Sequence, residues 1–437
     1  MIKVSAVNIV DGSRTPFLKA GDRPGPFLAS DLAVAAARPL ILRQPIAAHD
    51  FDEVILGCVM PTADEVNIAR VVSLRLGCGK LVPAYTVQRN CASGMQAIDS
   101  AAKDIQLGRA DLVLAGGAES MSHAPVMLND EMVAWLGRWM KARSIKQKLK
   151  TLSRLRAPML VPVIGLLRGL TDHTVGLSMG QTTEIIADRF SIDRRQMDEY
   201  AVMSHQRLAA AIDRDAFADE MVPLFNTTGF DASGHYFGED NGLRRDSSID
   251  KLAKLRPVFD RPYGRVTAGN SAQITDGAAW LILASDRAVK KHKLPVLGRL
   301  LDVSWAGLAP EQMGLGPVHA STPLLQRHNL SLQDIDVWEI NEAFAGQVLG
   351  CLSAWQNDEY CQRELGLEQA LGSIDPARLN PDGGAISMGH PVGASGARIV
   401  LHLLNVLKRE RLKTGIATLC IGGGQGGACL LERGDST

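Results

Sequence analysis

Residues 84–117 read AYTVQRNCASGMQAIDSAAKDIQLGRADLVLAGG, and this stretch decides the fold class. The apolar run at 84–89 predicts a β-strand, whereas 92–107 has the spacing of an amphipathic helix, with apolar side chains on one face. A second apolar run at 111–115 predicts another strand, which ends in two glycines. Strands that alternate with helices are typical of an α/β fold, in which helices pack on layered sheets.

The same order of elements returns near the C-terminus. Residues 91–94 (Cys-Ala-Ser-Gly) and 393–396 (Gly-Ala-Ser-Gly) each open a predicted helix. Each helix leads to an apolar strand that ends in glycines, at 112–117 and at 417–424. Two matched helix–strand units in the two ends of the chain indicate an internal duplication.

A different region separates the two halves. Residues 122–252 are more charged and irregular in their period, and we expect them to form an inserted loop domain. The first half is then predicted to consist of residues 1–121, completed by 253–295, and the second half of residues 296–437. Within the insertion, residues 182–214 predict a charged, solvated helix.

The early part of the insertion is strongly basic. Nine Lys or Arg residues lie between 131 and 170, against a single acidic residue, Glu131, and Trp135 and Trp139 interleave with them. One interpretation is a solvated helix that packs on its own domain. The other is a peripheral surface that docks on anionic lipid or on a partner subunit. No uninterrupted apolar run in the chain is long enough to span a bilayer.

The composition limits the class of protein. Hydrophobic residues make up 46% of the 437 residues, which is enough for a sizeable core. The formal net charge is +0, so no global field would recruit nucleic acid. The seven cysteines show no metal-ligand spacing, and no metal site is predicted. The N-terminus lacks the charged start and apolar stretch of a signal peptide, which indicates a cytoplasmic protein.

Cys91 is the strongest candidate nucleophile. It follows a predicted strand and stands at the start of a predicted helix, where free N–H groups and the helix dipole favour the thiolate. The small residues at 92–94 leave room for a bulky thioester. The alternative is a small buried cysteine at a tight strand–helix junction.

His390 lies in a loop between Gly389 and Pro391, just before the repeated helix motif. An imidazole has a pKa near neutrality and could take the proton of a thiol. The alternative is a loop histidine whose hydrogen bonds are satisfied locally. The polar pair Asn341 and Glu342 follows the apolar run at 335–340, where it could anchor a water, orient the histidine or cap a helix.

Cys420 ends a predicted strand and enters a glycine run. Gly422, Gly424 and Gly427 match the spacing of a dinucleotide-binding fingerprint. Only ten residues remain after this run, too few for the helix and strand that such a fingerprint needs. The glycines are better explained as bare backbone, whose N–H groups could hold a developing oxyanion.

Four motifs in order carry a resemblance over essentially the whole chain. They are Asn-Cys-Ala-Ser-Gly at 90–94, Asn-Glu-Ala-Phe at 341–344, Gly-His-Pro-Val-Gly-Ala-Ser-Gly at 389–396 and Cys-Ile-Gly-Gly-Gly at 420–424. This set resembles the thiolases, and the length and basic insert look most like the β-subunit of the fatty-acid oxidation trifunctional complex and its bacterial relatives. The resemblance implies a five-layered α-β-α-β-α fold.

The resemblance also implies roles for these residues. The cysteine that matches Cys91 takes the acyl group as a thioester, and the histidine that matches His390 activates it. The cysteine that matches Cys420 moves the proton of the acetyl α-carbon. The asparagine that matches Asn341 positions a water, which forms one oxyanion hole with the histidine. The backbone N–H groups that match Cys91 and Gly422 form the other.

Coenzyme A is the implied substrate, and no permanently bound cofactor is expected. Met179, Phe259 and Phe344 match apolar positions of the pantetheine channel, and Arg244 matches a residue near the nucleotide. Ser271 lies beside Ala272, which stands where short-chain thiolases carry a serine. This departure leaves the length of the acyl chain open.

The implied activity is that of a 3-ketoacyl-CoA thiolase, which cleaves 3-ketoacyl-CoA with CoA to acetyl-CoA and a shortened acyl-CoA in fatty-acid β-oxidation. The alternative is an acetoacetyl-CoA thiolase that acts in the condensation direction. Ketoacyl synthases and hydroxymethylglutaryl-CoA synthases share the fold, but they carry a histidine or asparagine in place of Cys420. The expected partners are CoA and acyl-CoA, a second copy in a homodimer or dimer of dimers, and a hydratase/dehydrogenase α-subunit.

Overall fold

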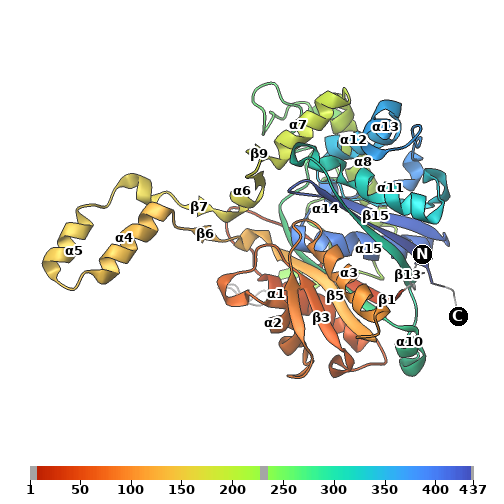
Figure 1. The fold of residues 1–437 in the computed structure, drawn as a ribbon, viewed down its shortest axis with the longest axis horizontal. Helices are drawn as coiled ribbons and strands as arrows, with labels where there is room; N and C mark the ends of the chain where they lie inside the picture. Colours follow the sequence, from red (N-terminus) through yellow and green to blue (C-terminus); the bar gives the residue numbers. More distant parts are fainter. Residues whose placement is uncertain (1–6, 227–234, 435–437) are drawn as a thin grey trace.

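The structure is a computed structural model that describes residues 7–226 and 235–434 (Figure 1). A ten-stranded mixed sheet forms its frame, in the order β14-β15-β16-β13-β1-β12-β5-β3-β4, with β2 paired to β12. The strands are β1 (Val7–Arg14), β2 (Leu18–Lys19), β3 (Glu53–Gly57), β4 (Ala84–Val87), β5 (Leu112–Ser120), β12 (Thr275–Ala284), β13 (Gly298–Gly307), β14 (Val337–Ile340), β15 (Thr414–Ile421) and β16 (Gln425–Arg433).

The sheet consists of two halves with the same topology. From the junction outward, the first half runs β1, β12, β5, β3 and the second runs β13, β16, β15, β14. In both halves the first three strands are antiparallel, and the fourth is parallel to the third. Strand β4 continues the first half in parallel, and a single parallel bridge from Trp338 to Leu379 stands at the matching place. The predicted duplication is therefore confirmed.

Helices α3 (Ser93–Gln106) and α15 (Val392–Arg409) pack on each other between the two halves of the sheet. Helices α1 (Ala29–Leu42) and α2 (Ile68–Leu76) cover the outer face of the first half. Helix α11 (Gly316–His328) covers the second half, with α12 (Ala345–Trp355) against it. The result is the predicted α-β-α-β-α layering (Figure 1).

Small residues of the two repeated motifs explain the close approach of α3 and α15. A Cβ atom on Gly94 would lie 2.9 Å from the backbone nitrogen of Ala397. A Cβ on Gly396 would lie 2.6 Å from the nitrogen of Met95. Distances under 3 Å are overlaps, so glycine is required at both crossings, and the helix starts are brought together at the centre of the molecule.

The prediction that residues 182–214 are helical is confirmed by α7 (Met179–Arg189) and α8 (Arg194–Asp213). The prediction that they are solvated is wrong, because α8 buries nine of its 20 residues. The charged side chains misled the prediction because several of them pair along the helix surface, as Arg195 does with Glu199 at 2.8 Å. The remaining face packs into the core beside α12.

Residues 126–169 form an arm that projects from the body (Figure 1). Its stalk is the ribbon of β6 (Val126–Met127) and β7 (Val163–Ile164), and its tip is the pair α4 (Asp130–Lys141) and α5 (Ile145–Leu152). The tip helices pack on each other, with the indole N–H of Trp135 donating to the carbonyl of Thr151 at 2.8 Å. They do not pack on the domain, contrary to one of the two interpretations.

The other elements are short. The helices are α6 (Gly165–Gly169), α9 (Ile249–Leu252), α10 (Asp286–His292), α13 (Asp358–Leu365) and α14 (Ala385–Met388), and two further ribbons pair β8 (Thr171–Asp172) with β9 (Leu177–Ser178) and β10 (Leu224–Asn226) with β11 (His235–Phe237). Within residues 7–226 and 235–434, no helix is long and apolar enough to cross a bilayer.

Candidate active site

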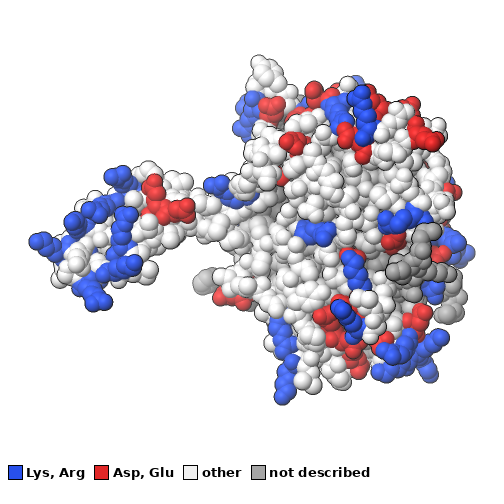
Figure 2. All heavy atoms as spheres, viewed as in Figure 1, with Lys and Arg blue, Asp and Glu red and all other residues white. Residues whose placement is uncertain are grey.

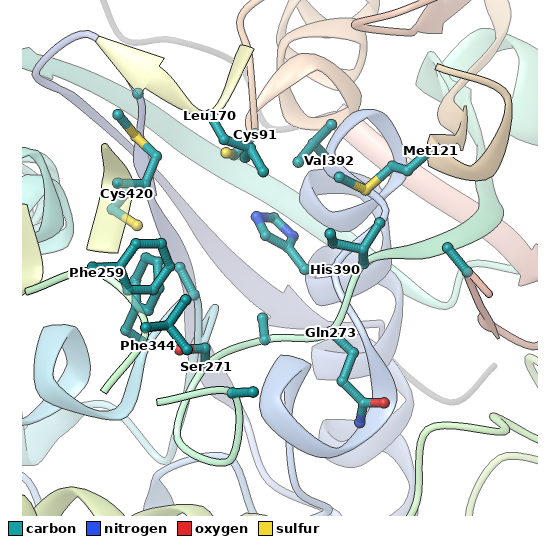
Figure 3. Close-up of a pocket in the computed structure, with 18 of the residues that line it drawn as sticks. Cys91, Met121, Leu170, Phe259, Ser271, Gln273, Phe344, His390, Val392 and Cys420 are labelled. Carbon is teal, nitrogen blue, oxygen red and sulfur yellow. The ribbon is translucent and has the colours of Figure 1, made fainter. Parts of the chain in front are cut away.

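A cavity of about 360 Å³ lies where the two halves meet, and its wall is mainly apolar (Figure 3). Nine of the ten predicted site residues line it, and the tenth, Asn341, lies directly behind His390. The nine are Cys91, Met179, Arg244, Phe259, Ser271, Phe344, His390, Cys420 and Gly422. Residues up to 331 positions apart in the chain, such as Cys91 and Gly422, therefore share one chamber.

Cys91 sits in a tight turn between β4 and α3. Asn90 adopts a left-handed conformation with φ of 44°, which is uncommon for a residue with a side chain. The hydroxyl of Ser93 stabilises the turn: it accepts from the backbone N–H of Arg89 at 2.9 Å and donates to the carbonyl of Asn90 at 2.7 Å. The side-chain amide of Asn90 donates to the carbonyl of Gly422 at 2.8 Å. The nucleophile turn and the glycine turn are thus tied together.

The expected low pKa of Cys91 is not found. Burial raises the pKa of this thiol to about 11, and a hydrogen bond from the backbone N–H of Gly422 opposes the rise only in part. The helix dipole favours a thiolate by about 1 kcal/mol or less, whereas loss of hydration can raise a thiol pKa by several units. Desolvation therefore outweighs the helix start, and the resting cysteine is a neutral thiol.

The hydrogen bonds of His390 favour one tautomer. The hydroxyl of Ser395 donates its one hydrogen to the carbonyl of Pro391 at 3.0 Å, so it accepts from Nδ1–H of His390 at 2.6 Å. Nε2 then carries the lone pair. Burial, with a contribution from the charge of Arg398, lowers the pKa of His390 to about 4. The imidazole is neutral at pH 7 and presents a base to the cavity that Cys91 also lines (Figure 3).

Asn341 lies behind the imidazole. Its Nδ2 is 3.5 Å from Nε2 of His390, and its Oδ1 is buried with no hydrogen-bond partner in the described protein. The helix-cap interpretation is wrong, because α12 begins at Ala345 and its N-cap residue is Phe344. A buried amide beside the base is the arrangement needed to orient the histidine or to hold a water.

Glu342, the second residue of the predicted polar pair, holds this part of the site in place. Its buried carboxylate accepts from Ser204 Oγ at 2.7 Å, Asn380 Nδ2 at 3.0 Å and the backbone N–H of Ile386 at 3.2 Å. A Cβ on Gly384 would lie 2.4 Å from the carboxylate carbon, so glycine is required there. The carboxylate thereby joins the Asn341 strand end to the loop that carries His390.

Cys420 is the second thiol of the cavity. Burial and the neighbouring Cys91 raise its pKa well above the usual range, so it is a neutral proton carrier in the resting site. The glycine run that follows is the hairpin turn between β15 and β16, where Gly423 and Gly424 have φ of 93° and 75°. A Cβ on Gly424 would lie 2.3 Å from a backbone carbonyl oxygen. The run is explained by the turn and by the N–H that Gly422 directs at Cys91.

Aromatic rings line another side of the cavity. Phe259 and Phe344 meet edge to face, with ring centroids 6.0 Å apart. Ser271 pairs with Phe344 in an antiparallel bridge and donates its hydroxyl to the carbonyl of Thr267 at 2.6 Å. Arg244 is exposed on the cavity wall. This wall could hold an apolar chain with a polar or anionic end outside.

Glu119, near the end of β5, was not predicted as a site residue. Its buried carboxylate accepts backbone N–H groups of Val59 at 2.8 Å, Met60 at 3.0 Å and Gly393 at 3.0 Å. Burial raises the pKa of this carboxyl to about 7, and its charge acts on Cys91. The only local signal was an acid after two strand glycines. Its partners come from both halves, so its role depends on tertiary structure.

Two thiols and a neutral histidine around one apolar cavity are the groups that acyl transfer through a cysteine thioester would need. Among residues 7–226 and 235–434, no group of three or more His, Cys, Asp or Glu side chains is placed to hold a metal ion.

Comparison with known proteins identifies the family. Residues 7–287 match "Thiolase, N-terminal domain" and residues 294–433 match "Thiolase, C-terminal domain". The chain is 37% identical to a 3-ketoacyl-CoA thiolase of Yersinia pestis over 425 residues, 97% of this chain and 96% of that protein. The chain belongs to the thiolase family, and it is an acyltransferase that uses CoA.

Solved structures agree. Human mitochondrial 3-ketoacyl-CoA thiolase superposes with a TM-score of 0.82 at 36% identity, covering 99% of this chain and 100% of that one. The acetyl-CoA acetyltransferase of Bacillus anthracis gives a TM-score of 0.84 at 35% identity, with 99% and 100% covered. The human enzyme has also been solved with CoA bound, at 35% identity, a TM-score of 0.83 and 99% of each chain covered.

Proposed function

We propose that this protein is a 3-ketoacyl-CoA thiolase that cleaves its substrate with CoA in fatty-acid β-oxidation. One observation carries the proposal: Cys91, His390 and Cys420 line a single apolar cavity, with the N–H of Gly422 directed at the Cys91 sulfur. Relatives with this activity in their names match the chain over nearly its full length.

In the first half-reaction, Nε2 of His390 takes the thiol proton as the Cys91 sulfur attacks the 3-keto carbon. The bond between carbons 2 and 3 then breaks. Acetyl-CoA leaves as its enolate, which takes a proton from the Cys420 thiol. The 3-keto carbon stays on Cys91 as an acyl thioester. A neutral base and a protonated second thiol are the starting states that this sequence needs.

In the second half-reaction, the thiol of CoA gives its proton back to Cys420 and attacks the thioester carbon. The Cys91 sulfur leaves and recovers its proton from His390. Each tetrahedral intermediate places negative charge on oxygen. The N–H of Gly422 is already fixed in the cavity and stabilises that charge without reorganisation, and a water held by Asn341 and His390 would be a second donor.

CoA fits the side of the cavity that carries Phe259 and Phe344, where the apolar pantetheine chain would lie between Met179 and Ser271. Arg244 is exposed there and could meet a phosphate of the nucleotide.

The test is CoA-dependent cleavage of 3-ketoacyl-CoA by the purified protein, with mass spectrometry of the acyl-enzyme. Cys91→Ala should abolish both turnover and labelling. Cys420→Ser should still be acylated at Cys91 by acyl-CoA but should lose cleavage. Turnover by Cys91→Ala would refute the proposal. Activity confined to acetoacetyl-CoA, with net condensation when the product is removed, would favour the acetyltransferase alternative.

We also propose a homodimer or dimer of dimers. Strand β4 is an outer edge of the ten-stranded sheet, and Tyr85 on it and Leu81 before it are exposed. An edge strand with free N–H and C=O groups is a natural place for a second copy to add its own strand. The division into residues 1–121, 122–252, 253–295 and 296–437 remains our proposal as well.

The tip of the arm fits an anionic membrane surface or a hydratase/dehydrogenase α-subunit. Figure 2 shows Lys and Arg side chains over the tip. Met140 on α4 and Ile145 on α5 are also exposed there. Vesicle flotation with and without anionic lipid, for wild type and for Lys146→Glu/Lys150→Glu, separates these partners. The seven cysteines are free thiols, which suits the reducing cytoplasm that we propose as the location.

A further inference from the structure

An ion pair lies in the core behind the catalytic histidine. Arg398 of α15 donates from Nη1 to Oε2 of Glu339 in β14 at 3.2 Å, and both side chains are 1% exposed. Glu339 stands two residues before Asn341, and Arg398 stands eight residues after His390. The pair therefore joins the two segments that carry the base and its amide neighbour. Neither member lines the cavity, so neither contacts the substrate.

The pair is only partly satisfied by its surroundings. Oε1 of Glu339 and Nε of Arg398 are buried and have no hydrogen-bond partner in the described protein. Because removal of two charges from water is costly, a buried ion pair stabilises a fold only when its geometry and further hydrogen bonds are good. The incomplete hydrogen bonding of this pair argues that stability alone does not explain it.

The charge of Arg398 acts on His390. Together with burial, it lowers the pKa of the imidazole, and the start of α15 beside the histidine adds a partial positive charge. Among the described residues, the other titratable groups that line the cavity are the neutral thiols of Cys91 and Cys420 and the exposed side chains of Lys19 and Arg244. The guanidinium and the helix start therefore both oppose the imidazolium that forms when His390 takes a proton.

We propose that Glu339 and Arg398 are positioning residues whose balanced charges let His390 accept the proton of Cys91. The carboxylate neutralises the guanidinium near the base, so the imidazolium meets less opposing charge as the thiol is deprotonated. The pair also ties β14 to α15 behind the contact of Asn341 with His390. The inference rests on the proposed function and adds two residues that act on the reaction through the histidine.

The charge of Glu339 depends on pH. Burial raises the pKa of this carboxyl to about 7, although the charges of His402 and Arg398 on α15 lower it. Asp382, before α14, and Glu342, after β14, raise it further. The carboxyl is therefore charged above pH 7 and neutral below it, whereas the guanidinium stays charged throughout.

Glu339→Gln removes the charge but keeps the shape and an oxygen that can accept from Arg398. Since one pKa unit of a base is a tenfold change in its protonation, kcat for thiolysis should fall about tenfold at about pH 8.5, with KM changed less than about threefold. At about pH 5.5 the wild type has lost the same charge, so the two kcat values should converge. Their ratio cancels the titration of groups that both proteins share, such as Glu119.

Removal of both charges should restore the rate. Arg398→Met/Glu339→Gln leaves no uncompensated charge near His390, so kcat should return to within about threefold of wild type at about pH 8.5. At about pH 5.5 the double variant should be about tenfold faster than wild type, in which the guanidinium has lost its counter-charge. This comparison holds even where Glu339→Gln alone fails to fold.

Asp240→Asn is the matched control. Asp240 is likewise 1% exposed, pairs with Arg14 at 2.8 Å and does not line the cavity. The control should lose thermal stability but keep wild-type kcat at both pH values. Alkylation of Cys91 by iodoacetamide repeats the comparison without turnover, because it needs only the base: Glu339→Gln should slow it about tenfold at about pH 8.5, and the double variant should not.

A ratio of wild-type to Glu339→Gln kcat that is the same at both pH values overturns the inference, because a structural role predicts that result. A double variant as slow as Glu339→Gln, or no faster than wild type at the lower pH, overturns it as well. A wild type that cleaves no 3-ketoacyl-CoA refutes the proposed function, and the alkylation rates then decide the inference separately.

Discussion

Replacement of Ser395 by alanine tests the tautomer of His390. The serine hydroxyl accepts from Nδ1 at 2.6 Å while it donates to the carbonyl of Pro391, so it holds the hydrogen on Nδ1 and leaves Nε2 as the base. During acyl transfer the imidazole takes a proton and becomes charged. The bond to Ser395 is then charge-assisted and stronger than in the resting enzyme.

The magnitude follows from that difference. A hydrogen bond to a neutral group is worth about 1 kcal/mol, and one to a charged group about 1.5–3 kcal/mol. The difference of about 0.5–2 kcal/mol means that Ser395→Ala should lower kcat by roughly 2- to 30-fold, because the lost bond is strongest in the transition state. KM for the substrate should change less than threefold, since Ser395 does not line the cavity.

The assay is steady-state thiolysis at several pH values, together with thermal unfolding. Ser321→Ala is the matched control, because Ser321 is a buried helical serine in α11 whose hydroxyl has no hydrogen-bond partner in the described protein. The control should keep wild-type kcat. A Ser395→Ala enzyme with full kcat, or one whose loss appears only in KM, would refute the assigned tautomer.

Four further predictions concern other parts of the structure. Glu119→Gln should lower kcat about tenfold or more with little change in KM, because an amide N–H₂ would face a backbone N–H that the carboxylate now accepts; equal kcat would argue against a positioning role. His390→Ala should slow alkylation of Cys91 by iodoacetamide at pH 7 at least tenfold, because a thiol with a pKa of about 11 depends on a base; an unchanged rate contradicts this. Gly424→Ala should destabilise the fold by about 2 kcal/mol or more, through its φ of 75° and the overlap with a backbone carbonyl, as measured by urea unfolding. His402, between Glu220 and Asp382, has a folded pKa raised to about 10 from 6.5, so it should contribute stability fully below pH 6.5 and lose it as the pH rises to 10; unfolding of wild type and His402→Gln should show a pH slope in that window only for the wild type.

Much of the fold followed from local sequence. The run at 84–117 contains β4, α3 and β5 with boundaries close to those predicted, although β5 continues to Ser120. The alternating residues at 1–10 also predict a strand; residues 1–6 lie outside the described part, and the observed strand is β1, Val7–Arg14. These successes have one cause: the period of apolar residues and the small residues at helix starts are properties of neighbours in the chain.

The sequence also showed the internal duplication and which residues form the site. The small residues at 93–94 and 395–396 mark a crossing that only small side chains allow, and the motifs around Cys91, Asn341, His390 and Cys420 lie in order along the chain. Function needs these residue types in these surroundings, so they can be found before any coordinates are known.

Only the tertiary structure decided the protonation states of the site residues and the hydrogen bonds that hold them in place. The position of Cys91 at a helix start predicted a thiolate, but the fold buries the sulfur. Desolvation raises the pKa of the thiol by more than the helix dipole lowers it. Three features depend on groups far apart in the chain: the tautomer of His390, the hydrogen bonds of Glu119 to both halves, and the burial of α8. Hydration and hydrogen-bond partners are properties of a position in space, whereas the period of a helix is a property of the chain itself.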